Sequence, residues 1–122
     1  MASAYETTRL IAADKVEGTS VYSLSGEKVG NIKNVMIDKS SGRVAYATMS
    51  AGGVLGIGSD YYALPWNALH YNTDVDGYQL DVDRHKLEGA PVASEDDLVH
   101  RLEDRDFGNK VHTYYGTDPF WQ

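Results

Sequence analysis

One segment has the residue types of a calcium site. Asn72, Asp74 and Asp76 alternate before Gly77, and Asp83 stands where an EF-hand loop would place its last ligand. Such loops bind Ca²⁺ through oxygen ligands at alternating positions, a glycine at the sharp turn and a final bidentate glutamate. Here asparagine replaces the first aspartate, aspartate replaces the glutamate, and the sequence predicts no flanking helices. Because Asp-Gly between strands is a strong hairpin signal, we interpret the segment as a turn and predict no metal or cofactor.

The other reactive side chains lack the spacing that catalysis or metal binding requires. The four histidines are His70, His85, His100 and His112. None falls in a His-Glu-x-x-His pattern or beside a serine in a nucleophile elbow, so we expect them at surface or rim positions. The triplet Asp106-Phe107-Gly108 matches a kinase magnesium motif, but no other kinase motif accompanies it. We predict no catalytic residue and expect that the protein is not an enzyme.

Composition excludes further classes of function. The chain has 122 residues, no cysteine, and a net charge of -7, from 18 acidic and 11 basic side chains. Thiolate chemistry and disulfides are therefore excluded. Binding to nucleic acid or to an anionic membrane surface depends on clustered Lys and Arg, so neither is expected. The polar N-terminus and the lack of a long apolar run predict a cytoplasmic protein without membrane insertion.

The elements that position these side chains are predicted to be mostly strands. Apolar patterns predict strands at residues 19–24, 28–38, 44–50, 61–64 and 78–83. Ser25 and Gly26 form a turn after the first strand, and residues 38–42 form a polar loop after the second. The second strand changes phase after Ile32, as a β-bulge does, so the sheet is expected to curl into a barrel. Residues 51–58, which include four glycines, are expected to form a flexible connection.

The C-terminal region has a different character. Gly89, Ala90 and Pro91 form a break, and Ser94 precedes an acidic first turn typical of a helix start. After this short helix we predict an aromatic tail that contains Tyr114, Tyr115, Phe120 and Trp121. Large rings are enriched at the centres of interfaces, so these four residues are the candidate partner contacts. Packing of the tail on its own domain is an equal alternative. Trp66, beside Leu64 and Leu69, is expected to cap the core.

Residues 10–87 resemble the PRC-barrel family, which is named after the cytoplasmic barrel of the photosynthetic reaction centre H subunit. The resemblance rests on residues 21–24 with Gly26 and on the runs KVGNIKNVMID (28–38), GRVAY (42–46) and LPWNAL (64–69), and the ending VHTYYG (111–116) adds to it. It implies a mainly β fold, a small antiparallel β-barrel, here with a short C-terminal helix and an aromatic tail. The implied division is a lead-in (1–9), a barrel domain (10–88), and a C-terminal helix and tail (89–122).

The resemblance also implies a class of function. Family members use the barrel to dock other macromolecules, so we expect a non-enzymatic docking or assembly module whose partner is another protein or a second copy in a homodimer. An alternative is an accessory of photosynthetic or other membrane electron-transfer complexes, bound to a membrane-protein complex as the H subunit barrel is. The chain lacks the membrane helix of the H subunit, and no functional residue is carried over from the family.

Overall fold

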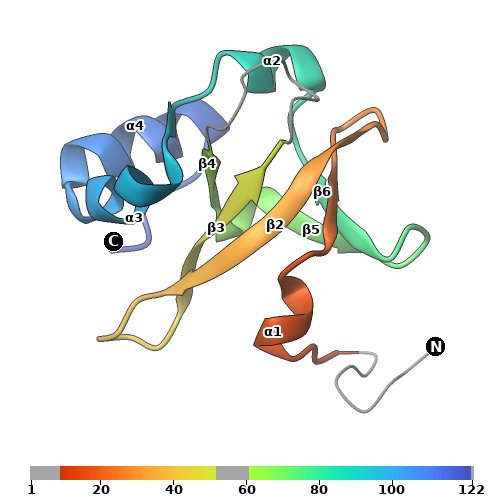
Figure 1. Cartoon of the computed structure of the whole chain (residues 1–122), viewed down its shortest axis with the longest axis horizontal. Coiled ribbons are helices and arrows are strands. Elements are labelled where there is room, and N and C mark those ends of the chain that lie inside the picture. Colours follow the sequence, from red (N-terminus) through yellow and green to blue (C-terminus); the bar gives the residue numbers. More distant parts are fainter. Residues whose placement is uncertain (1–8, 52–60, 122) are drawn as a thin grey trace.

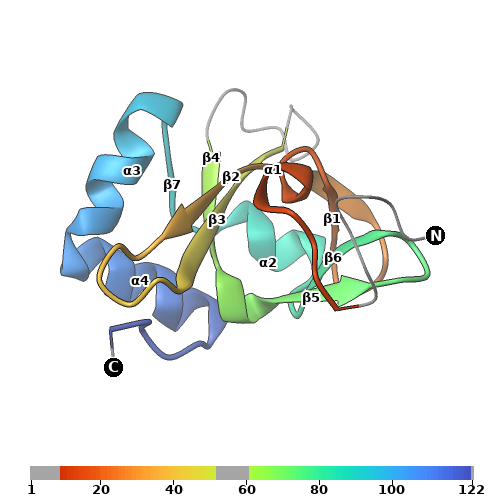
Figure 2. The same ribbon diagram turned by 90° about the horizontal axis from the view of Figure 1, so that it is seen from below.

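One curled β-sheet forms the body of the protein. The computed structural model describes residues 9–51 and 61–121, and within them the strand order is β5-β6-β1-β2-β3-β4-β7. The strands are β1 (Ser20–Tyr22), β2 (Lys28–Ile37), β3 (Val44–Ser50), β4 (Tyr61–Pro65), β5 (Leu69–Asn72), β6 (Gly77–Leu80) and β7 (Val92–Ala93). The helices are α1 (Ala13–Val16), α2 (Arg84–Glu88), α3 (Glu95–Glu103) and α4 (Arg105–Tyr115), with a 3-10 helix at Trp66–Ala68. Helices α3 and α4 lie at one end of the molecule and the β5–β6 hairpin lies at the other (Figure 1, Figure 2).

Two predictions fall almost entirely outside the described residues. They are the N-terminal lead-in at residues 1–9, of which Arg9 is described, and the glycine-rich connection at residues 51–58, of which Ala51 is described. Ala51 is a buried core residue directly after β3.

Strand β2 contains the bulge that its sequence predicts. Its pairing with β3 changes register between Ile32 and Asn34, where the apolar pattern changes phase, and again before Ile37. Ile32 is buried before the irregularity, whereas Val35 and Met36 beyond it are only half-buried. An extra residue in one strand bends it and increases the local twist. The predicted bulge is therefore confirmed.

The predicted strands are present, with small differences at their ends. Strand β3 occupies the predicted residues, and β4 includes Pro65 as its last residue. Strands β1 and β6 are shorter than predicted, since Leu24 and Val82 lie beyond them. Strand β3 is buried on both faces, from Ala45 through Met49, although its alternating pattern is also compatible with a strand half exposed to water.

The expected closed antiparallel barrel is not what the described residues form. Strands β5 and β7 lie at opposite edges of the sheet and do not pair with each other. Strand β7 has 2 residues and pairs only with Tyr61 and Tyr62 of β4, and β5 has 4 residues, so these edges offer few backbone groups for closure. Strand β1 also pairs with β6 in parallel, with Val21 opposite Tyr78. The fold is a mainly β, curled but open sheet with C-terminal helices.

The C-terminal region contains two helices rather than one short helix and a long tail. Ser94 is the N-cap residue of α3, as predicted, but its hydroxyl bonds the Asp97 carboxylate (3.2 Å) instead of a backbone N–H. Helix α4 then extends to Tyr115, so Tyr114 and Tyr115 are helical and the predicted tail is wrong for these two residues. The helices complete the core, because Leu98 of α3 and Val111 of α4 are fully buried with the side chains of the sheet.

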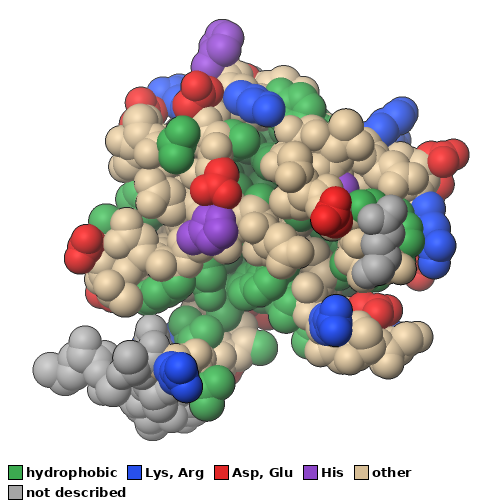
Figure 3. Space-filling view, turned by 180° about the vertical axis from the view of Figure 1, so that it is seen from behind, with side chains coloured by type: hydrophobic (Ala, Val, Ile, Leu, Met, Phe, Trp, Pro, Cys, Tyr) green, Lys and Arg blue, Asp and Glu red, His purple; other side chains and the backbone are tan. Residues whose placement is uncertain are grey.

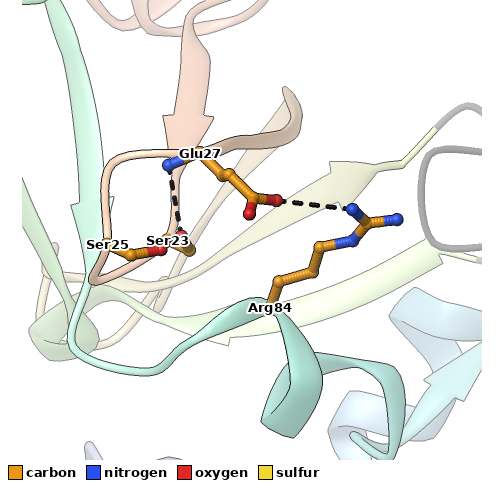
Figure 4. A network of polar contacts seen from close by, with 4 residues as sticks. All are labelled: Ser23, Ser25, Glu27 and Arg84. Carbon is orange, nitrogen blue, oxygen red and sulfur yellow. Dashed lines mark hydrogen bonds and ion pairs between the residues drawn. The ribbon is translucent and has the colours of Figure 1, made fainter.

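A polar network joins the β1–β2 turn to α2 (Figure 4). The Ser23 hydroxyl accepts a hydrogen bond from the Glu27 N–H (3.3 Å) and lies 3.1 Å from the Ser25 hydroxyl. The Glu27 carboxylate lies 3.4 Å from the Arg84 guanidinium. Gly26 has a φ of 93°, which confirms the predicted turn. Because the Glu27–Arg84 pair is exposed, it orients the turn more than it stabilises the fold.

Candidate partner-binding surface

Helix α4 positions all four predicted contact residues, Tyr114 and Tyr115 directly and Phe120 and Trp121 through the segment that follows it. Its N-cap residue Asp104 accepts a hydrogen bond from the Asp106 N–H (2.9 Å). Gly116 ends the helix with a φ of 71°, a left-handed conformation that glycine adopts without steric penalty. Val111 and Tyr115 are buried and stand four positions apart, so they mark the helix face that packs on the sheet. After Gly116 the chain turns back along α4 (Figure 2).

Tyr115 and Tyr114 lie in different environments although they are adjacent. Tyr115 is 7% exposed, its hydroxyl has no hydrogen-bond partner among the described residues, and burial raises the pKa of its phenol. Tyr114 is half-buried, and its hydroxyl donates to the Lys86 carbonyl oxygen. The Lys86 ammonium lies 5.4 Å from the centre of the Tyr114 ring. Tyr115 is therefore part of the core, and Tyr114 remains accessible beside α2.

A shallow groove of about 500 Å³ runs beside Tyr114 and is open to solvent. We call it the α4 groove; it is lined by Gly89, Pro91, Asn109, Lys110, Thr113 and Tyr114. The lining surface is mostly apolar, and none of the described residues that line the groove is acidic. Two lysines lie at this groove, Lys110 in its lining and Lys86 over the Tyr114 ring. The chain as a whole, in contrast, has a net charge of -7. The groove thus combines apolar contact area with local positive charge.

Phe120 and Trp121 pack on the protein itself. Phe120 meets Tyr46 of β3 edge to face, with ring centres 5.6 Å apart. Trp121 meets His112 edge to face at 5.8 Å, and the Arg105 guanidinium lies 5.2 Å from the centre of the Trp121 ring. Both aromatic side chains remain half-buried. We call residues 117–121 the strap and its contact residues Tyr46, Gly108 and His112 the seat.

The seat contains two buried polar side chains. His112 is 3% exposed and Tyr46 is 2% exposed. Among the described residues, neither the Tyr46 hydroxyl nor Nε2 of His112 has a hydrogen-bond partner. Burial raises the pKa of Tyr46 to about 12, and burial lowers the pKa of His112, an effect that Asp118 opposes. The expectation that the histidines lie at the surface or rim is therefore wrong for His112.

The other three histidines are exposed, and two carboxylates of this region, Asp81 and Asp83, have partners in the fold. His85 and His100 are exposed, and exposed His70 lies 2.9 Å from the Asp81 carboxylate. Asp83 is the N-cap of α2 and accepts a hydrogen bond from the Lys86 N–H (2.9 Å).

The calcium-like segment is a hairpin turn. Asn72 and Gly77 pair at the ends of β5 and β6, and the Asn72 side chain accepts from the Asp74 N–H (2.9 Å). Asp76 completes the turn with a φ of 49°. The hairpin interpretation is confirmed. Within residues 9–51 and 61–121, no three His, Asp or Glu side chains gather in a way that could hold a metal ion.

Trp66 was predicted to cap the core, and the structure agrees with this prediction in part. It is half-buried, and its ring lies 5.5 Å from that of Tyr78, a buried residue of β6.

The face of the molecule opposite that in Figure 1 carries scattered charges of both signs, with hydrophobic side chains reaching the surface in its lower half (Figure 3). No helix in the described part of the chain has the length and apolar character needed to cross a bilayer.

The groove was missed by sequence reasoning because its residues come from two separate segments, the α2–β7 connection and α4. One available signal was the spacing of Gly108, Val111, His112 and Tyr115, which share one face of a helix. That spacing predicts a helix through Tyr115, with Asn109, Lys110 and Thr113 on other faces. It also places His112 on the buried face.

Comparison with known proteins assigns the sheet to a family. Residues 9–87 match the family model of the PRC-barrel domain. This match begins before α1 and ends in α2, so the residues of α3, α4 and the strap follow it. No curated protein sequence matches the chain. Strands β1 to β6, with the bulged β2, and the Leu64-Pro65-Trp66 run lie within the match, and β7 follows it. The chain belongs to the PRC-barrel domain family.

Proposed function

We propose that this protein is a non-enzymatic docking module that binds a protein partner in the α4 groove. The observation that carries the proposal is the groove itself: an open, mostly apolar depression beside the half-buried Tyr114. Tyrosine presents a large rigid surface and loses little conformational entropy on binding, so it is enriched in binding sites. The sheet serves as the scaffold that holds the α2–β7 connection and α4 on either side of the groove.

The charge around the groove supports a preference among protein segments. Lys110 lines the groove and Lys86 lies over the Tyr114 ring, while the described lining residues include no carboxylate. A segment with apolar side chains and an acidic side chain would match both properties. The groove is small compared with a standard protein interface, so the expected partner element is a short segment. A second copy of the chain is also able to supply such a segment.

The test compares three substitutions in the full chain. Thr113→Arg fills the groove from an exposed helical position, and Lys110→Glu reverses its charge. Val99→Arg is the matched control, because Val99 is 40% exposed on α3 and receives the same new side chain outside the groove. Tagged variants are used to capture proteins from an extract of the source organism, with quantitative mass spectrometry, and light scattering reports self-association.

A groove partner is retained by the unmodified protein and by Val99→Arg, and lost by both Thr113→Arg and Lys110→Glu. If all variants retain the same proteins in the same amounts and the same molar mass, docking through the α4 groove is wrong. Circular dichroism of each variant checks that loss of a partner does not reflect loss of fold.

A further inference from the structure

His112 is enclosed by the strap and by β3. Its ring centre lies 5.3 Å from Tyr46, 6.3 Å from Phe120 and 5.8 Å from Trp121. Two of these three rings belong to the strap, so the strap is a principal cover between His112 and solvent. A histidine that is 3% exposed among aromatic rings is held in its neutral form.

The hydrogen bonding of His112 favours that neutral form. Its Nδ1 lies 2.8 Å from the Thr117 hydroxyl at the start of the strap, and its Nε2 has no partner among the described residues. A protonated imidazole donates from both nitrogens. Protonation at Nε2 would therefore place a donor and a positive charge in a site without an acceptor, an arrangement that is costly in a buried site.

Three other titratable or charged groups face this site. Tyr46 of β3 stays neutral, because burial raises its pKa to about 12. The carboxylate of Asp118, in the strap, opposes the effect of burial on the pKa of His112. Arg105 of α4 lies over the far strap ring, that of Trp121. Burial is the larger effect and lowers the pKa of His112.

The strap is less buried than the other neighbours of His112, since each of its residues is exposed or half-buried. Thr117 donates its N–H to the His112 carbonyl oxygen (2.9 Å), and Phe120 and Trp121 are held by ring contacts. Helix α4 is anchored more firmly, by the fully buried Val111 and by Tyr115. Because Gly116 already has a left-handed conformation, rotation at this position can swing the strap while α4 stays docked. Hydration of a charged His112 then requires the strap to move and leaves the sheet intact.

We propose that the strap is a pH-sensitive latch: protonation of His112 releases residues 117–121 from the seat and exposes the surface that the strap and the seat share. This surface consists of Tyr46, Gly108 and His112 on the body and of Phe120 and Trp121 on the freed strap. Its α4 residues, Gly108 and His112, lie on the buried face of the helix, whereas the α4 residues of the groove lie on other faces. The latch therefore does not depend on the proposed groove partner.

The test uses Trp121 as the reporter in the full chain. The chain has 2 tryptophans, so Trp66→Phe leaves Trp121 as the only one. As the pH falls below the ordinary histidine range, at about 6.5, Trp121 emission is expected to shift to longer wavelength while far-ultraviolet circular dichroism stays constant. His112→Asn, which keeps a polar partner for Thr117 but does not titrate, should abolish the shift. His85→Asn, at an exposed histidine, should leave it unchanged.

Asp118 supplies a test of direction. Its carboxylate stabilises protonated His112 while the strap is closed. Asp118→Asn removes this stabilisation, so the pKa of His112 in the closed state falls further below its value in the open state. The fraction of molecules with a released strap at about pH 5 should therefore increase. The latch is overturned if Trp121 emission does not change with pH in the folded protein, or if the shift persists in His112→Asn. Should His112→Asn fail to fold, imidazole NMR of the Trp66→Phe protein decides: titration of His112 without a Trp121 response overturns the latch.

Discussion

Gly108→Ala tests how firmly the strap is held, because Gly108 of α4 lies beside both Tyr46 of β3 and Trp121 of the strap. A methyl group at this position would lie 3.0 Å and 3.2 Å from two atoms of the Trp121 ring, and 3.1 Å from the Tyr46 hydroxyl. These distances are shorter than ordinary van der Waals contact, so a neighbour must move by a few tenths of an ångström. Tyr46 is fixed in β3, a strand buried on both faces, whereas Trp121 lies at the end of the strap. We expect Trp121 to move.

Two opposing contributions determine the change in the free energy of unfolding. Alanine is favoured over glycine within a helix by about 0.5–1 kcal/mol. Overpacking of a rigid site costs about 1–3 kcal/mol. If the strap yields, most of the overpacking is relieved and the net change should lie within about 1 kcal/mol of zero. Trp121 should then become more exposed, and its emission should shift to longer wavelength at neutral pH.

The assay is denaturant unfolding together with Trp121 emission, both in the Trp66→Phe background. Gly30→Ala is the comparison, because a methyl group there would lie 2.5 Å from the Ser50 carbonyl oxygen, a backbone atom that cannot step aside. Gly30→Ala should destabilise the protein by about 1–3 kcal/mol or more. A loss of about 2 kcal/mol in Gly108→Ala with unchanged Trp121 emission would refute our reasoning, since the strap would then be a rigid part of the core.

Three further predictions concern the seat and α4. Tyr46→Phe removes a buried hydroxyl that has no partner among the described residues, so the free energy of unfolding should stay the same or rise by up to about 1 kcal/mol, measured by denaturant titration; a clear loss would show that the hydroxyl is bonded. Burial lowers the pKa of His112 in the folded chain, so the unfolded chain binds the proton more readily and thermal stability should fall as the pH drops below about 6.5. His112→Asn should remove this part of the pH dependence, and a stability that rises over that interval would contradict the sign. Asp104→Ala removes the side-chain cap of α4 and should cost about 1 kcal/mol in thermal or denaturant unfolding, and Asp104→Asn should preserve most of it.

Much of the sheet was predictable because its signals are local. The phase change after Ile32 predicts the bulge, Gly26 predicts the first turn, and Asp76-Gly77 predicts the hairpin that the calcium-like pattern resembles. Each depends on neighbouring residues and on backbone preferences that tertiary contacts do not override here. Closure of the sheet is different, since it depends on whether β5 and β7 are long enough to meet in space. Their 4 and 2 residues carry no sequence signal of that kind.

The candidate surface was predictable only in part. An aromatic cluster near the C-terminus was visible, but its division into core, groove and strap depends on where α4 ends. Gly108 and the β-branched Val111 and Thr113 weaken the helix propensity of this stretch, so propensity alone does not predict a helix through Tyr115. Docking against β4 outweighs that propensity, as is common for helices with a buried face. His112 is buried because α4 turns it toward β3, and the motif spacing on which the surface prediction rested contains no information about that helix.

The parallel contact between β1 and β6 has a consequence for the order of folding. Val21 and Tyr78 are neighbours in the sheet although most of the family domain lies between them in the sequence. The antiparallel run from β1 to β4 is connected step by step along the chain, whereas this contact has to close a long loop, which is entropically unfavourable and slow. During synthesis the N-terminal strands therefore emerge before the strand that covers the outer side of β1. Until β6 arrives, β1 is an open edge able to pair with other chains.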